Sequence, residues 1–208
     1  MSTADEPREY KTFEGNLDDR AVHLCVDMQG LFGPGGPWET PWVERRLPRI
    51  SSIAERAAAQ TIFTRFVPPQ YPKQMPGRWQ RYYEHWREVT RERLDPEFLE
   101  LLPELRRLVP PALVLDKPVY SPFHGRRLVS TLRERAANVV VVTGAETDVC
   151  VLATILGAVD YGYRVVVVAD AVCSSSDTGH DAVLTLLGNR LGHQIEMAET
   201  DEILEAWR

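Results

Sequence analysis

The chain has 208 residues, of which 44% are hydrophobic and 26% charged, which is typical of one globular domain with a sizeable core. It has 24 lysines and arginines against 30 aspartates and glutamates; with a net charge of −6 it lacks the basic field that binds nucleic-acid phosphates. Three cysteines are too few for a disulfide framework and fit a reducing compartment. We therefore expect a cytoplasmic protein with no nucleic-acid partner.

The first twenty residues are polar and acidic, without the apolar core of a signal peptide. No stretch approaches the roughly 18 apolar residues that a membrane-spanning helix needs. The expected organisation is a polar N-terminal arm over residues 1–20 and a single domain over residues 21–208, with no membrane partner.

Short β-rich runs alternate with helical patterns along the rest of the chain. Strands are expected at residues 21–26, 61–67, 112–115, 139–142, 165–168 and 194–198. Helices are expected at 43–59, in an aromatic-rich stretch after Gly77, at 126–135, 148–161 and 181–191, and near the C-terminus. This alternation predicts an α/β fold: a doubly wound, mostly parallel six-stranded sheet with helices on both faces and ligands outside the carboxyl ends of its strands.

Three reactive side chains lie at or just beyond the carboxyl ends of predicted strands. They are Asp27 after the first strand, Lys117 after the third and Cys150 after the fourth. A parallel sheet brings these ends together, although each residue taken singly has an ordinary explanation as a strand-end cap, a surface lysine or a buried cysteine. Together they predict a cysteine nucleophile, held as a thiolate by the ammonium and by helix N-terminal amides, with Asp27 as proton acceptor.

The turn before Cys150 contains Glu146, Thr147 and Asp148. Thr147 can cap the helix that follows. The two acids would disfavour a thiolate if they faced the sulfur, so we expect them to point elsewhere or to bind polar groups of a substrate.

Three segments resemble motifs of the isochorismatase-like hydrolases. Leu24-Cys25-Val26-Asp27-Met28-Gln29 resembles the strand and D-x-Q opening of that family, and Gly144-Ala145-Glu146-Thr147-Asp148-Val149-Cys150-Val151 resembles its nucleophile turn. Lys117, with Tyr120, Ser121 and Phe123, is similar to the lysine and S-x-F segment between them. The likeness follows the family's element order from about residue 21 to residue 197, and three motifs in order are more specific than one.

The resemblance implies a Rossmann-like fold and a Cys, Asp, Lys triad that cleaves a C–N bond of a small amide or N-carbamoyl compound through a thioester. It also implies a cis peptide, by position Ala145–Glu146, and oxyanion stabilisation by the backbone amides of Glu146 and Cys150. The expected partners are a small-molecule substrate and further copies of the chain in a homodimer or homotetramer.

The sequence departs from the nicotinamidase branch of that family. Those members carry a D-x-H segment and a further histidine that ligate a metal, whereas this chain reads Thr64-Arg65-Phe66-Val67-Pro68-Pro69 at that place. We therefore expect no metal and no cofactor, and nicotinamidase activity is disfavoured.

Several residues are candidates for substrate binding, and each has an alternative. Arg65 would pair with a substrate carboxylate or a neighbouring acid, Glu146 would contact substrate or solvent, and the aromatic residues would wall a pocket or pack in the core. The full set is Phe32, Arg65, Trp79, Tyr120, Phe123 and Glu146. Two other functions stay open: hydrolysis of a vinyl ether, as in the family's isochorismatase branch, and noncatalytic binding on the same fold.

Overall fold

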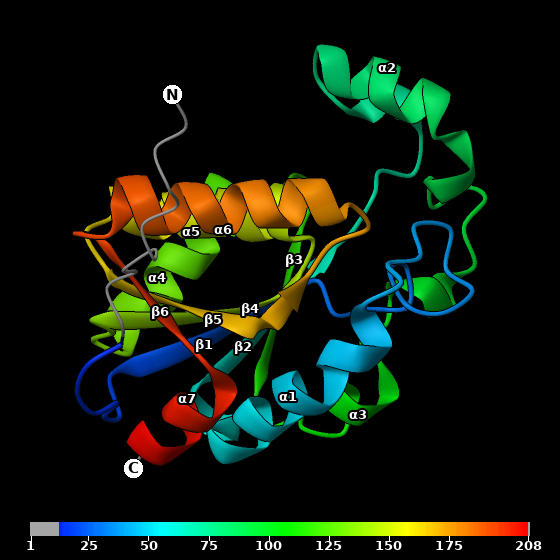
Figure 1. The fold of residues 1–208 in the computed structure, drawn as a ribbon. Coiled ribbons are helices and arrows are strands. Elements are labelled where there is room, and N and C mark those ends of the chain that lie inside the picture. Colours follow the sequence, from blue (N-terminus) through cyan, green and yellow to red (C-terminus); the bar gives the residue numbers. More distant parts are fainter. Residues whose placement is uncertain (1–12, 208) are drawn as a thin grey trace, which may run out of the picture.

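A six-stranded sheet forms the centre of the structure, a computed structural model that describes residues 13–207 (Figure 1). Its strands are β1 (Ala21–Val26), β2 (Thr61–Phe66), β3 (Leu113–Lys117), β4 (Val139–Ala145), β5 (Arg164–Cys173) and β6 (Ile195–Ala198). They lie in the order β3-β2-β1-β4-β5-β6, and each neighbouring pair is parallel. The prediction of a doubly wound parallel sheet is confirmed, and its order reverses between β1 and β4.

Helices cover both faces of this sheet (Figure 1). On one face lie α1 (Val43–Arg56), α3 (Pro103–Arg106) and α7 (Thr200–Ala206), and on the other lie α4 (Arg126–Glu134), α5 (Leu152–Asp160) and α6 (Asp177–Leu191). Helix α2 (Arg78–His85) lies apart from both layers, beyond the carboxyl ends of the strands.

Two hydrophobic cores explain the continuous apolar runs of the central strands. In β1, Val22 and Leu24 belong to the core under α4, α5 and α6, whereas Ala21 and Cys25 belong to the core under α1 and α7. Successive side chains of a strand point to opposite faces, so a strand covered on both sides is apolar at every position.

The observed boundaries differ from the predicted ones where local contacts decide them. Strand β3 extends through Lys117, which pairs in register with Phe66. Helix α6 begins at Asp177, four residues before the predicted start, because the Ser176 hydroxyl accepts a hydrogen bond from the Gly179 amide and caps the helix. The pairing between β4 and β5 shifts its register between Val142 and Gly144 and then resumes, so β5 extends to Cys173.

The predicted N-terminal arm falls largely on residues 1–12, which lie outside the described residues. From residue 13 onward the segment packs against the domain: Leu17 is buried and forms a bridge with Trp207, and the Phe13 amide donates to the Met197 carbonyl. Within residues 13–20 of the expected arm, the buried Leu17 thus holds the chain against the domain.

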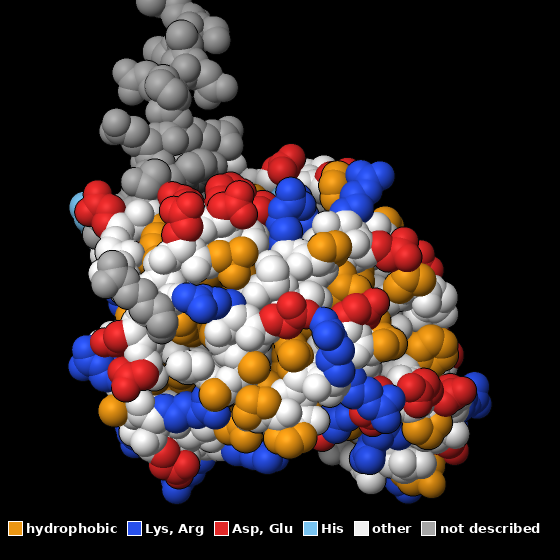
Figure 2. All heavy atoms as spheres, turned by 90° about the horizontal axis from the view of Figure 1, so that it is seen from below, with side chains coloured by type: hydrophobic (Ala, Val, Ile, Leu, Met, Phe, Trp, Pro, Cys, Tyr) orange, Lys and Arg blue, Asp and Glu red, His pale blue; other side chains and the backbone are white. Residues whose placement is uncertain are grey.

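The outer surface mixes charges of both signs. On the face seen in Figure 2, acidic and basic side chains alternate and do not form a broad basic patch. In the described part of the chain, no helix combines the length and apolarity that crossing a membrane would take.

A fully buried histidine, His23, lies in β1 near the centre of the sheet. His23 Nδ1 is 3.1 Å from Thr61 Oγ1, and its Nε2 is 2.8 Å from Thr143 Oγ1. The two hydroxyls can satisfy a neutral imidazole, which has one donor and one acceptor. Burial lowers the pKa of His23 to about 3, so the ring stays neutral in the folded protein.

This histidine makes stability depend on pH. Because the unfolded chain takes up the proton near pH 6.5, the contribution of His23 is complete above that pH and is lost as the pH falls toward 3. We expect His23 to account for a loss of about 2 kcal/mol in the free energy of unfolding between about pH 7.5 and about pH 5. Denaturant titrations should show this loss in wild type and in the exposed-site control His85→Gln but not in His23→Gln; an equal loss in His23→Gln would refute the assignment.

Candidate active site

The sheet gathers three distant side chains at the point where its strand order reverses. Asp27 directly follows β1, Lys117 ends β3, and Cys150 lies in the turn after β4. Lys117 Nζ is 2.6 Å from Asp27 Oδ2 and 3.4 Å from Cys150 Sγ. All three residues are buried. The structure therefore places the predicted residues in one cluster at the site where doubly wound sheets bind ligands.

The backbone at Asp27 turns sharply out of β1. Its φ is 51°, in the left-handed region that aspartate tolerates better than most residues. The Asp27 amide donates to the Thr64 carbonyl, and the Thr64 hydroxyl donates to Oδ1 at 2.6 Å. Gln29, in the same motif, bonds to both the amide and the carbonyl of Phe66. These contacts fasten the end of β1 to β2 and leave Oδ2 for Lys117.

Lys117 reaches Asp27 across the width of β2. Its Nζ lies 4.9 Å from the centroid of the Phe66 ring, a cation–π distance. Besides its bonds to Asp27 and Cys150, the ammonium donates to the Val119 carbonyl at 3.2 Å, so each of its three protons has an acceptor. Burial lowers the pKa of Lys117, but the charges and hydrogen bonds of Asp27 and Cys150 together outweigh it, so the pKa lies above its usual value.

Cys150 is positioned by a close approach of two strands. Gly144 has a φ of 111°, and a Cβ there would lie 2.1 Å from the Val26 carbonyl oxygen, so only glycine lets β4 lie this close to β1. The Ala145–Glu146 peptide bond is cis, and one turn of π-helix over Thr147–Val151 carries the sulfur. α5 continues from this turn.

The surroundings of Cys150 favour the thiol over the expected thiolate. Burial and the negative charge of Asp27 raise the pKa of the Cys150 thiol well above its usual value, and the opposing effect of Lys117 is smaller. The sequence shows the lysine but not how completely the sulfur is removed from water. In the resting protein we therefore expect a neutral thiol beside the Asp27–Lys117 ion pair.

The three polar residues of the turn before Cys150 have separate partners. Asp148 accepts a hydrogen bond from Ser174 Oγ at 2.6 Å. Thr147 does not cap the helix, because its hydroxyl bonds to His180 Nδ1 at 2.9 Å. Glu146 Oε1 accepts from the Ser175 amide at 3.0 Å.

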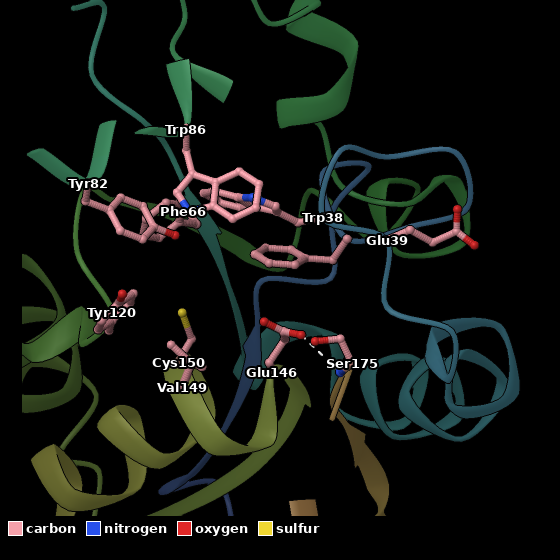
Figure 3. A pocket seen from close by; sticks show the side chains of 11 residues that line it. Trp38, Glu39, Phe66, Tyr82, Trp86, Tyr120, Glu146, Val149, Cys150 and Ser175 are labelled. Atoms are coloured by element: carbon pink, nitrogen blue, oxygen red, sulfur yellow. Dashed lines mark hydrogen bonds between the residues drawn. The ribbon is translucent and has the colours of Figure 1, made fainter. Parts of the chain in front are cut away.

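A cavity of about 300 Å³ opens above the sulfur (Figure 3). Cys150 and Val149 lie at its floor, and aromatic rings form its far wall. The lining residues are Phe32, Trp38, Glu39, Phe66, Tyr82, Trp86, Tyr120, Glu146, Val149, Cys150 and Ser175. Its size and mainly apolar wall suit a small molecule with few polar groups.

Of the substrate-binding candidates, Phe32, Tyr120 and Glu146 line this cavity and the other three do not. Arg65 instead binds Asp116 through Nε and Nη2 and Glu100 through Nη1. From its place in β2, Arg65 faces acids of neighbouring segments. Of its two expected roles, pairing with a neighbouring acid is therefore the one seen, and pairing with a substrate carboxylate is not.

The other two excluded candidates pack behind the cavity. The Trp79 ring lies against Tyr120, with centroids 4.8 Å apart, and supports the wall from outside. Phe123 is buried and stacks on Tyr161 at 5.4 Å. Both residues pack against other aromatic side chains, as the core-packing alternative expected, and neither lines the cavity.

Four aromatic residues of the cavity were missed as binding candidates: Trp38, Phe66, Tyr82 and Trp86. The sequence carries a signal for two of them, because the aromatic residues after Gly77 recur at helical spacing. Tyr82 lies in α2 and Trp86 directly follows it, and both reach the cavity over the strand ends. Trp38 comes from a Gly- and Pro-rich loop, whose path the sequence does not indicate.

Comparison with known proteins agrees with this geometry. The family model described as isochorismatase domain matches residues 21–199. The chain belongs to the isochorismatase family. A crystal structure of a cysteine hydrolase from Pseudomonas syringae pv. phaseolicola shares this family fold, with a TM-score of 0.80, 23% identity and 98% coverage of both chains.

Two curated relatives match most of this chain, and one of them is an amidohydrolase. The chain is 27% identical to an uncharacterized isochorismatase family protein, YaaI, of Bacillus subtilis, over 87% of this chain and 95% of the relative. It is 25% identical to maleamate amidohydrolase of Pseudomonas putida, over 81% and 79% of the two chains. This chain spans less than half the length of three further relatives that it matches, among them ureidoacrylate amidohydrolase RutB of Methylobacterium radiotolerans.

The electrostatics predict that removing the Asp27 charge makes Cys150 more reactive. Asp27→Asn keeps a side chain that tolerates a left-handed backbone but removes a charge that raises the thiol pKa. Iodoacetamide should alkylate Cys150 about tenfold faster at about pH 7 in this variant, as a fall of one pKa unit implies.

Mass spectrometry of the Cys150 peptide separates this thiol from the two other buried cysteines. Asp116→Asn, at an exposed carboxylate paired with Arg65, is the matched control and should leave the rate unchanged. A slower or unchanged rate in Asp27→Asn would contradict the charge arrangement.

Proposed function

We propose that this protein is a cysteine-dependent hydrolase that cleaves a C–N bond of a small amide or N-carbamoyl compound through a thioester on Cys150. The observation that carries the proposal is the contact of one ammonium with both a carboxylate, at 2.6 Å, and a thiol sulfur, at 3.4 Å, at the floor of a cavity. A nucleophile beside its proton acceptor is what covalent catalysis requires. The names of maleamate and ureidoacrylate amidohydrolases support the reaction class.

In the first step the Cys150 sulfur attacks the substrate carbonyl carbon while Asp27 takes the thiol proton. A C–S bond forms, and the carbonyl electron pair moves onto its oxygen. The backbone amides of Glu146 and Cys150 are the proposed donors to that oxyanion. As Asp27 becomes neutral, the ammonium of Lys117 faces the developing charge on the sulfur and stabilises it.

In the second step the tetrahedral intermediate collapses and the C–N bond breaks. Asp27 returns its proton to the leaving nitrogen, so ammonia or an amine departs and the acyl or carbamoyl group remains on sulfur. Water then attacks this thioester, with Asp27 as base, and the C–S bond breaks to release the acid. The proton held by Asp27 passes to the sulfur and restores the thiol.

The substitution Cys150→Ala should abolish turnover. Ammonia release would be screened on a panel of small amides, ureas and N-carbamoyl acids that includes maleamate and ureidoacrylate. For any substrate found, Cys150→Ala should reduce kcat at least about a thousandfold, because the covalent route is lost. Cys173→Ala, at a buried cysteine outside the cavity lining, should stay active.

Acid quenching during turnover should trap the acyl or carbamoyl group on the Cys150 peptide. Full turnover by Cys150→Ala would refute the cysteine mechanism. Cleavage of a vinyl ether but of no amide would favour the isochorismatase branch, and an absence of both turnover and adduct would favour a binding protein.

Assembly into a homodimer or homotetramer is proposed on the family resemblance, and a cytoplasmic location on the small number of cysteines. Size-exclusion chromatography with light scattering tests the first, and a monomer would refute it.

A further inference from the structure

The cavity above Cys150 is walled by the faces and edges of aromatic rings. Trp38 is at the centre of this wall, with its ring centroid 6.0 Å from that of Phe32 and 6.2 Å from that of Tyr82. Trp86 stands almost perpendicular to it, at 6.0 Å and 84°, so two indoles form a corner (Figure 3). Each indole has an electron-rich face, to which a cation is attracted.

One carboxylate faces this aromatic corner. Glu146 Oε1 accepts hydrogen bonds from the Ser175 amide at 3.0 Å and the Thr40 hydroxyl at 3.4 Å, which fix the side chain. Its second oxygen, turned into the cavity in Figure 3, receives no hydrogen bond from the described residues. Glu39 also lines the cavity, but its exposed carboxylate points away and bonds to the Gly35 amide. The Glu146 carboxylate is thus fixed in place through one oxygen, and its other oxygen is available to a bound molecule.

Positive charge is lacking on the same lining. Among the described residues that line the cavity there is no lysine, arginine or histidine. The two nearby candidates are committed elsewhere: Lys117 donates to three acceptors beneath the floor, and Arg65 is bound to Asp116 and Glu100. A substrate carboxylate in this cavity would face Glu146 without a cation to balance it, which is unfavourable.

We propose that the substrate of this site carries an alkylammonium group, held between the Glu146 carboxylate and the aromatic corner of Trp38 and Trp86. The inference rests on the proposed function and specifies its substrate class: cationic amides or N-carbamoyl amines. An alkylated cation is attracted by the faces of aromatic rings, and it loses less hydration than a small ion when it enters an apolar cavity. The carboxylate supplies the counter-charge, and the amide carbon is left to lie over the sulfur.

Three amides of similar size test the charge preference. Trimethylammonioacetamide is cationic, tert-butylacetamide has the same shape without the charge, and malonamate is anionic. We expect kcat/KM for ammonia release to fall in the order cationic, neutral, anionic. The decisive quantity is the ratio of kcat/KM for the cationic amide to that for the neutral one.

Substitution of Glu146 separates recognition from intrinsic reactivity of the amides. Glu146→Gln keeps the shape of the side chain and an acceptor for the Ser175 amide, and should reduce the cationic-to-neutral ratio at least about tenfold. The matched control Glu39→Gln, at the carboxylate that points away, should keep the ratio. Because both enzymes meet the same two amides, chemical differences between the amides cancel. A ratio unchanged in Glu146→Gln would overturn the proposal.

Binding to a protein that lacks the nucleophile distinguishes the two proposals. In Cys150→Ala, quenching of tryptophan fluorescence by each amide reports occupancy beside Trp38 and Trp86. The cationic amide should bind at least about tenfold more tightly than the neutral one, and this preference should be lost when Glu146→Gln is added. If wild type hydrolyses no amide but this preference holds, the hydrolase proposal fails and the cation site stands. Turnover without any preference for the cation would leave the hydrolase standing and refute the cation site.

Discussion

The buried ion pair between Asp27 and Lys117 is the interaction on which the site depends. Both side chains are almost fully removed from water, and each would be costly to bury alone. The cost is offset because the ammonium has three acceptors and the carboxylate also accepts from Thr64. Removing one partner of such a pair costs about 3–5 kcal/mol, so the pair links β1 to β3 as well as preparing the chemistry. Both partners come from the β3-β2-β1 half of the sheet, and Cys150 joins them from the turn after β4, across the point where the strand order reverses.

The pair also sets how the sulfur can react. A neutral thiol beside a matched pair of charges is stable in a dry site, whereas a thiolate would leave a net negative charge there. Transfer of one proton to Asp27 moves the negative charge from carboxylate to sulfur without changing the total, and Lys117 contacts both positions. Nucleophile formation is thereby coupled to the arrival of a carbonyl group, and a permanently reactive cysteine is not exposed to the medium.

The sheet and the three clustered residues could be predicted from sequence because each leaves a local mark. Runs such as the four valines at residues 139–142 indicate strands buried on both faces, and Asp27, Lys117 and Cys150 follow such runs. The rest depends on where loops travel and on burial. Arg65 and Trp79 have the right chemistry but point to other partners, whereas Trp38 enters the cavity from a loop with no periodic pattern. The protonated state of Cys150 follows from its burial, which no motif encodes.

The central claim is that burial and the charge of Asp27 hold Cys150 as a neutral thiol until a substrate arrives. The ultraviolet absorbance of a thiolate, taken as the difference between wild type and Cys150→Ala across a pH titration, measures this directly. The account predicts no thiolate signal from Cys150 at about pH 7 and its appearance only well above the usual pKa of a cysteine, about 8.5. A full thiolate signal at about pH 7 would contradict it.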